Sequence, residues 1–239
     1  MGLFDVFARS GPAALKKHAA RTANKRAQQP DRWESIQALA GMKSADSVAA
    51  LLERFRFTID PTITDREEKE AAFEGIVETG APAVEPVRTF MKHNDSISWP
   101  VKILEKLLTR EELLNELLSV LESLDTEYER DPEKKIQVLS YLSEHKSPRI
   151  LPQVLRFLSD RDDTARYQAA AALFAQDDAE QARQPLLDAL LSDESVRNRS
   201  QILDGFIARS WDAGDQVESL KPKLPRNYTV DKTGKLKKG

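Results

Sequence analysis

The chain has 239 residues, of which 40% are hydrophobic, and this is enough to bury a sizeable core and excludes a peptide-sized fold. It has no cysteine, so a disulfide framework, an iron–sulfur cluster, a thiolate zinc site and a cysteine nucleophile are excluded. The net charge of −3 is unevenly distributed along the chain: residues 1–30 carry +5, residues 31–220 carry −14 and residues 221–239 carry +6. The ends are therefore expected to attract anions and the body to repel them.

The first 30 residues join a short apolar segment to a basic one. Leu3, Phe4 and Phe7 belong to the apolar part, and Lys16 and Lys17 open the basic part. A short hydrophobic segment followed by a polybasic stretch is typical of proteins that attach reversibly to an anionic membrane surface. The alternative is a capping helix that covers the apolar face of the first repeat, which every helical repeat array requires.

The sequence shows neither the apolar stretch of a signal peptide nor that of a membrane span. We therefore expect a cytoplasmic protein. Attachment to the inner face of the membrane through the N-terminal segment is the alternative.

From residue 31 onward, apolar residues recur at three- and four-residue spacing in one segment after another. This spacing is typical of amphipathic helices, and no strand-like segment interrupts it before the tail. The predicted helices span residues 31–41, 44–57, 64–79, 82–93, 98–108, 110–124, 132–145, 148–159, 162–176, 179–192, 194–210 and 213–221. The body of the chain is therefore expected to be all-α.

Helix-start signals support these boundaries. In a capping box, a threonine caps the helix and a glutamate three residues later bonds back to the threonine backbone. Two such boxes are predicted, at Thr64–Glu67 and Thr109–Glu112. Two further starts place a cap residue before a first-turn proline, which has no helical hydrogen bond to lose, at Asp131-Pro132 and Ser147-Pro148.

The helices repeat with a period of about 33 residues. Pro86, Pro152 and Pro185 occupy equivalent places in three helices and are separated by 66 and 33 residues. Residues 159–173 contain an acidic turn, an arginine and an alanine-rich helix, and the apolar residues 185–191 follow as a second helix. A further copy begins at Ser192, in which polar residues replace three of the expected alanines at Asn198, Ser200 and Gln201.

This layout resembles HEAT repeats, of the short type first described in phycobilisome lyases. The resemblance is strong over residues 131–210 and rests on the period alone over residues 31–130. It implies an α-solenoid, a right-handed superhelix of HEAT-like helix pairs, with about six pairs over residues 31–220. The domains expected on this basis are an N-terminal segment at 1–30, the solenoid at 31–220 and a basic tail at 221–239.

No catalytic constellation is apparent in the sequence. The three histidines, His18, His93 and His145, lie in different segments without metal-ligand spacing, and we expect them to face solvent. Acidic pairs in the turns, at Asp162-Asp163 and Asp177-Asp178, are interpreted as helix caps or first-turn carboxylates. We therefore predict neither a metal nor a cofactor, and no enzyme activity.

Two enzymatic alternatives come from relatives of the resembled fold. HEAT-like DNA glycosylases use tryptophans and an aspartate on a basic concave face, and this chain has Trp33, Trp99 and Trp211. The acidic body disfavours nucleic acid, and packed or rim tryptophans are the alternative interpretation. A chromophore lyase is the other enzymatic relative, but nothing in the sequence indicates a bilin site.

The second helices of such repeats line the concave face, and basic residues recur on them. The predicted partner-binding residues are Arg54, Arg56, Arg88, Lys92, Arg149 and Arg156, with Arg183 as a further member of the strip. An arginine strip would suit an acidic or amphipathic segment of a partner protein, because guanidinium groups pair well with carboxylates. The alternative is scattered surface charge paired with Glu53, Glu85 and Asp188.

The tail from Tyr228 to Leu236 is interpreted as two short extended segments around a turn that ends at Gly234. It would cap the last repeat or reach a partner. Together these observations predict a non-enzymatic protein-interaction scaffold or adaptor. A nucleic-acid-binding solenoid and a membrane-surface adaptor are the alternatives.

Overall fold

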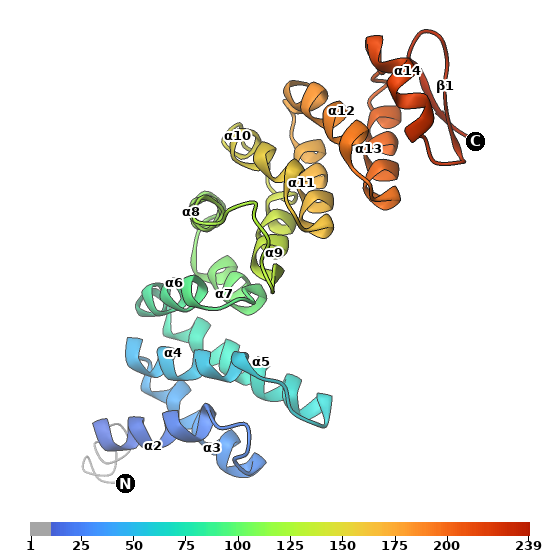
Figure 1. The fold of residues 1–239 in the computed structure, drawn as a ribbon. Coiled ribbons are helices and arrows are strands. Elements are labelled where there is room, and N and C mark those ends of the chain that lie inside the picture. The colour runs from blue at the N-terminus through green and yellow to red at the C-terminus, as the bar shows by residue number, and fades with distance from the viewer. Residues whose placement is uncertain (1–10) are drawn as a thin grey trace. The chain divides into compact units, whose positions relative to one another are not determined.

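The computed structural model describes residues 11–239 (Figure 1). The chain divides into two compact units, Met1–Leu113 and Leu114–Gly239, which are called unit 1 and unit 2 below. Leu3, Phe4 and Phe7, the residues of the predicted apolar N-terminal segment, lie outside the described residues. Both units are built from helices, and the only strands within residues 11–239 form a small C-terminal hairpin. The predicted all-α, solenoid-type fold with a C-terminal β-hairpin is confirmed.

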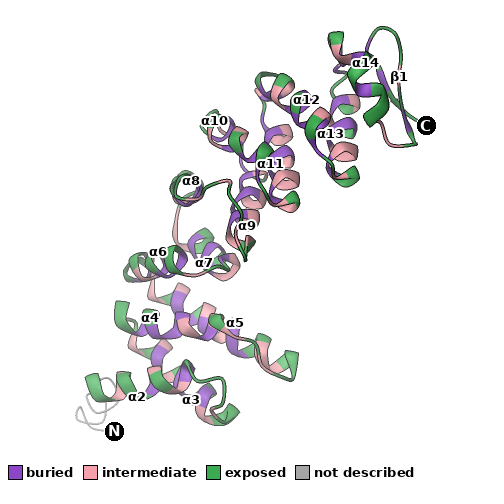
Figure 2. Ribbon diagram, in the orientation of Figure 1, coloured by how far each residue is buried: buried purple, intermediate pink, exposed green. Residues whose placement is uncertain are grey.

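Unit 1 consists of consecutive helices joined by short turns. They are α2 (Pro12–Thr22), α3 (Gln29–Met42), α4 (Ala45–Leu52), η1 (Glu53–Arg56), α5 (Thr62–Thr79), η2 (Ala81–Ala83), α6 (Val84–His93) and α7 (Ser98–Leu107), and α8 (Arg110–Glu122) crosses into unit 2. Helices α3 and α5 pack side by side, as do α4 and α6, so first helices contact first helices and second helices contact second helices. Their shared core contains buried aliphatic side chains, among them Ile36, Leu51, Ile76 and Val87. Figure 2 colours the buried residues of these helices purple.

Helix α2 occupies the part of the N-terminal segment that the structure describes. It begins at Pro12, whose fixed φ suits the first helical turn, and it packs against α3 and α4. The packed face of α2 contains the buried His18, and Lys16 and Lys17 are exposed. Lys16 and Lys17 therefore lie on a helix whose packed face contributes to the core of unit 1.

The start of α5 differs from the prediction. The helix begins at Thr62 rather than Thr64, and its N-cap residue, Pro61, has no side-chain cap. Asp65 instead accepts a hydrogen bond from the backbone N–H of Ile59, 3.1 Å away. The predicted Thr64–Glu67 capping box is therefore wrong. The Thr109–Glu112 box is confirmed, because the Glu112 carboxylate lies 2.8 Å from the Thr109 backbone nitrogen and the Thr109 hydroxyl accepts from the Glu112 N–H.

Unit 2 continues the alternation of first and second helices. Its elements are α9 (Glu133–Leu142), α10 (Ile150–Val154), η3 (Leu155–Ser159), α11 (Asp163–Ala175), η4 (Ala179–Ala182), α12 (Arg183–Ser192), α13 (Val196–Ala208), η5 (Gly214–Gln216), α14 (Val217–Leu220) and η6 (Lys221–Lys223). Several second helices that were predicted as continuous contain 3₁₀ turns, such as η3 after α10 and η4 before α12. The prolines of these helices contribute to the interruption, because a proline has no backbone N–H to donate to the helical hydrogen-bond pattern.

The alanine-rich helix α11 lies between α9 and α13. Asp162 caps it by accepting hydrogen bonds from the backbone of Thr164 and Ala165, each at 2.9 Å, which confirms the predicted cap. Ala165, Ala169 and other alanines of α11 are buried. Small side chains let neighbouring helices approach closely, which explains why alanine recurs in the repeat.

The C-terminal hairpin consists of β1 (Tyr228–Val230) and β2 (Leu236–Lys238), paired antiparallel with Tyr228 opposite Lys238. Gly234 ends the turn with a φ of 81°, as predicted, and a Cβ there would lie 3.1 Å from the backbone nitrogens of Ala213 and Gly214. Strand β2 packs against α13. The tail is therefore an integral part of unit 2.

Candidate partner-binding surface

A groove lies between the second helices of unit 1. Helix α4 is capped by Ser44, whose side chain forms a reciprocal capping box with Ser47, and the helix continues into η1. Helix α6 packs alongside α4 and leaves an open cavity of about 190 Å³ between them. The cavity is lined by Ala49, Leu52, Glu53, Arg56, Pro86, Thr89, Phe90, His93 and Asn94.

The groove has an apolar floor and a charged rim. Leu52 and Phe90 are buried and belong to the floor. The guanidinium of Arg56 lies 5.8 Å from the centre of the Phe90 ring, and its Nη1 lies 3.1 Å from Oε1 of Glu53. The Arg56 side chain remains 48% exposed, so it is available to a ligand carboxylate as well as to Glu53. His93 is exposed at the same rim.

Arg88 and Lys92 extend the cationic character along α6. They stand four residues apart, so they lie on the same side of the helix. Arg88 is paired with Glu85, as the surface-charge alternative anticipated, and its side chain is 31% exposed, whereas Lys92 is exposed. Three of the predicted partner-binding residues therefore belong to one groove and its flanking helix.

Arg54 does not belong to this surface, and the prediction that it faces outward is wrong. Its side chain is fully buried, and it donates hydrogen bonds to Glu68 and Asp65, each at 2.7 Å. Arg32 binds the same Glu68 carboxylate, and Lys69 pairs with Asp65. Burial disfavours ionisation of Asp65, but hydrogen bonds from Lys69, Arg54 and the Ile59 N–H outweigh it and hold its pKa below the ordinary value. Arg54 is thus a core residue.

The predicted residues of unit 2 are held by contacts within that unit. Arg149 is exposed and donates to the side chain of Asn115 at 2.7 Å. Arg156 donates to the backbone oxygen of Leu121 at 2.7 Å and lies over the Phe157 ring. Arg183 donates to Asp212 at 2.8 Å. These arginines tie neighbouring turns and helices together, which is a role that the sequence analysis did not assign to them.

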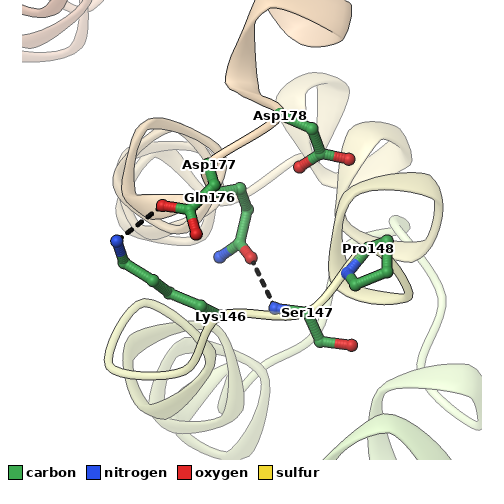
Figure 3. Close-up of a pocket in the computed structure, with 6 residues that line it drawn as sticks. All are labelled: Lys146, Ser147, Pro148, Gln176, Asp177 and Asp178. Atoms are coloured by element: carbon green, nitrogen blue, oxygen red, sulfur yellow. Dashed lines mark hydrogen bonds and ion pairs between the residues drawn. The ribbon is translucent and has the colours of Figure 1, made fainter.

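Between the turns of unit 2 lies a cleft of about 220 Å³, shown in Figure 3. The ammonium group of Lys146 meets the carboxylate of Asp177 at 2.6 Å across it, and the Ser147 backbone N–H donates to the buried Gln176 side chain at 3.1 Å. Asp178 also lines the cleft and makes no side-chain cap. The interpretation of Asp177 as a cap or first-turn carboxylate is therefore wrong, because it serves an ion pair between two repeats.

Unit 2 also contains a buried ionic device that occurs twice. Lys135 of α9 binds Asp160 in the turn before α11 at 2.9 Å, and Arg166 of α11 binds Asp193 in the turn before α13 at 2.7 Å. Each aspartate also accepts a backbone N–H from two residues later, Asp162 for Asp160 and Ser195 for Asp193. The sequence analysis missed this device, although the 33-residue spacing of Asp160 and Asp193 was a signal that could have revealed it.

The pair formed by Asp193 and Arg166 is more exposed to solvent than the pair formed by Asp160 and Lys135. Burial disfavours ionisation of Asp193, but hydrogen bonds from Arg166, Asn198 and the Ser195 N–H outweigh it and hold the Asp193 pKa below the ordinary value. The same carboxylate raises the pKa of Arg166. Equivalent contacts between successive repeats are the structural basis of the sequence period.

Residues 114–204 match the family model of HEAT repeats. The match starts at the first residue of unit 2 and ends within α13, so it covers both copies of the buried ionic device. It supports the predicted resemblance to HEAT repeats, and the assignment to the phycobilisome-lyase type stays a prediction. Comparisons with curated proteins and with solved structures gave no match.

Two of the three histidines and two of the three tryptophans pack against other groups of the protein. The Nδ1 atom of the buried His18 lies 3.1 Å from the Ser35 hydroxyl oxygen, and His145 is buried as well, so the prediction that all three histidines face solvent is wrong. Burial lowers the pKa of His18, with Lys17 contributing in the same direction. Trp99 stacks on Phe55 with ring centres 5.0 Å apart.

Trp211 also packs edge-on against an aromatic side chain, Phe206, and Trp33 is 38% exposed. Within residues 11–239, no three His, Asp or Glu side chains are grouped so as to hold a metal ion. No helix in the same part of the chain combines the length and the apolar character needed to cross a bilayer.

Proposed function

We propose that this protein is a non-enzymatic interaction scaffold or adaptor that binds an acidic or amphipathic segment of a partner protein in the groove between α4 and α6. The observation that carries the proposal is the combination of an apolar floor at Phe90 with a half-exposed arginine at the rim, Arg56. Such a groove suits a helix that places an apolar side chain on the floor and a carboxylate at the rim.

Charge also favours an acidic ligand at this place. Arg56, Arg88, Lys92 and His93 surround or flank the groove, whereas Glu53 and Glu85 are already engaged by Arg56 and Arg88. A guanidinium can bind a second carboxylate through its remaining N–H donors. A HEAT-repeat array commonly serves as a protein-interaction scaffold, which agrees with this assignment for a chain that contains such repeats.

The test uses two fluorescein-labelled 16-residue amphipathic peptides that share leucine positions and carry either glutamate or lysine on the polar face. Fluorescence anisotropy with the full chain should show binding of the glutamate peptide and weaker binding of the lysine peptide. The double variant Arg56→Glu/Lys92→Glu should weaken glutamate-peptide binding about tenfold or more, because attraction becomes repulsion at the rim. A Thr89→Trp variant, which fills the groove without changing charge, should weaken it as well.

The matched control is Arg66→Glu/Lys106→Glu. Both side chains are exposed in unit 1 on α5 and α7, and Arg66 is paired with a glutamate on its own helix, as Arg56 is paired with Glu53. This control changes the net charge by the same amount and should bind the glutamate peptide like the wild type. Equal weakening by the control and the groove variant, or no effect of Thr89→Trp, would place the binding surface elsewhere.

A membrane-surface adaptor is the second candidate, favoured by the exposure of Lys16 and Lys17 on α2. Each basic residue near an anionic bilayer contributes about 1 kcal/mol to attachment. Sedimentation of the full chain with vesicles containing 30% phosphatidylserine would test it. Lys16→Glu/Lys17→Glu should abolish co-sedimentation, and a wild-type chain that stays in the supernatant at low salt would reject this candidate.

A further inference from the structure

The C-terminal hairpin is anchored to unit 2 on one side. The hydroxyl of Tyr228 donates to Asp204 of α13 at 2.8 Å, and the ammonium group of Lys238 pairs with the same carboxylate at 2.8 Å. Leu236 is buried, and the backbone N–H of Ala213 donates to Gly234 at 2.8 Å. These contacts hold the hairpin as a fixed part of the surface.

The opposite side of the hairpin presents lysines. Successive side chains of a strand point to opposite faces, so Lys235 and Lys237 point away from α13 because Leu236 points toward it. Both are exposed, and neither makes an ion pair with any residue in the described range 11–239. Thr229, paired with Lys237 in the sheet, is exposed on the same side. We call Thr229, Lys235 and Lys237 the lysine face.

Two aspartates flank the lysine face, and both are engaged by other donors. Asp212, which pairs with Lys235 in a β-bridge, accepts hydrogen bonds from Arg183 and from the Gly214 N–H, at 2.8 and 2.9 Å. Asp231 Oδ1 accepts hydrogen bonds from the backbone N–H groups of Thr233 and Lys235, at 2.9 and 3.1 Å, and from the Thr233 hydroxyl. The hydrogen bonds from Thr233 and Lys235, with a smaller contribution from the nearby charge of Lys237, lower the pKa of Asp231. The ammonium groups of the lysine face therefore remain available to an external anion.

Geometry and charge together select the kind of anion. Side chains two residues apart on a strand stand about 6.5–7 Å from one another, which is also the spacing of alternate side chains in an extended peptide. The strands contain three residues each, so the face accommodates a short segment. The acidic body of the chain, at −14, repels a long polyanion, and no large exposed hydrophobic side chain lies in residues 221–239 to enter a bilayer.

We propose that the lysine face of the C-terminal hairpin docks a short, extended acidic segment of a partner protein that carries carboxylates on alternating residues. This surface is separate in sequence from the α4–α6 groove and binds a strand rather than a helix. The lysines act as point charges on a preformed face, so little ordering is needed on binding.

The test measures fluorescence anisotropy of the full chain with two labelled peptides of identical composition. In one peptide glutamate and threonine alternate over eight residues, and in the other they occur in pairs. The alternating peptide should bind more tightly at low salt, and rising salt should weaken it. Lys235→Gln/Lys237→Gln should weaken its binding about tenfold, and Lys235→Arg/Lys237→Arg should retain it.

The matched control is Lys16→Gln/Lys17→Gln, which removes two exposed lysines elsewhere and should bind the alternating peptide like the wild type. Arg56→Glu should also leave this binding unchanged, which separates the lysine face from the groove of unit 1. An unchanged near-ultraviolet circular dichroism spectrum shows that the hairpin variants keep their fold. The proposal is overturned if both peptides bind equally, if the control loses as much affinity, or if single-stranded DNA or phosphatidylserine vesicles depend more strongly on Lys235 and Lys237 than the peptide does.

Discussion

Both units bury ion pairs, but they arrange them differently. In unit 1, Arg32 and Arg54 converge on one carboxylate, Glu68, and Arg54 extends to Asp65, so the charges form a single cluster. In unit 2, the pairs are separate and recur along the chain, with each aspartate joining one repeat to the next. Unit 2 contains the segment that matches HEAT repeats.

The difference shows what makes a repeat recognisable in sequence. A contact that recurs between successive repeats requires the same residue type at the same place in each copy, and this produces a periodic sequence. A cluster that gathers charges from three helices imposes no period, because each member has a different role. Helix pairing persists in both units, since it depends on the pattern of apolar residues rather than on the ion pairs.

The largest effect is expected from Glu68→Gln, which tests whether unit 1 depends on one central carboxylate. Arg32 and Arg54 would both remain buried without a charged partner, so the free energy of unfolding should fall by about 3–5 kcal/mol. Urea denaturation followed by circular dichroism measures the change. Glu70→Gln on the same helix removes only an exposed pair with Arg66 and should cost less than about 0.5 kcal/mol.

A double-mutant cycle on Lys135 and Asp160 tests the corresponding pair of unit 2. Each single change, Lys135→Met or Asp160→Asn, should cost about 2–3 kcal/mol because one buried group loses its partner. The loss from Asp160→Asn should be smaller than that from Glu68→Gln, since Lys135 also lies 3.6 Å from Glu129. The double variant should cost less than the sum of the two, and simple additivity would show that the pair is not coupled.

Close helix packing also differs between the units, and glycine substitutions measure it. A Cβ at Gly75 would overlap the Cβ of Ala40 and lie 3.1 Å from its Cα, whereas at Gly205 it would meet the ring of Phe174. Gly75→Ala should therefore destabilise by about 1–3 kcal/mol, and Gly205→Ala by less, because a ring can rotate more easily than a backbone can move. Gly41→Ala meets no atom within 4 Å and should be neutral or stabilising in thermal unfolding.

The smallest effect concerns acid stability. Asp193 has a pKa below its ordinary value, so it binds its proton less readily when folded than when unfolded, and its contribution to stability is present at neutral pH. This contribution should begin to decline as the pH falls below about 5 and should be lost as the pH falls through the lowered pKa of the folded state. Asp193→Asn should lower the free energy of unfolding by about 1 kcal/mol at pH 7. It should also make the free energy of unfolding fall less steeply as the pH is lowered into the acid range. If the free energy of unfolding of the variant depends on acid pH as steeply as that of the wild type, other carboxylates dominate the acid sensitivity of the protein.

The sequence by itself determined the helical class, the period, the Thr109 and Asp162 caps and the C-terminal hairpin around Gly234, because these depend on local spacing and on the conformations that individual residues favour. The tertiary structure decided which charged residues are buried. Arg54 and Arg56 are two residues apart, yet the first is fully buried and the second is half-exposed, because Glu68 and Asp65 on the next helix pair with Arg54. Likewise Lys238 is bound to Asp204 of α13 while its neighbour Lys237 faces outward. A charged side chain is buried where a distant segment supplies its counter-charge, and that pairing is a property of the folded chain.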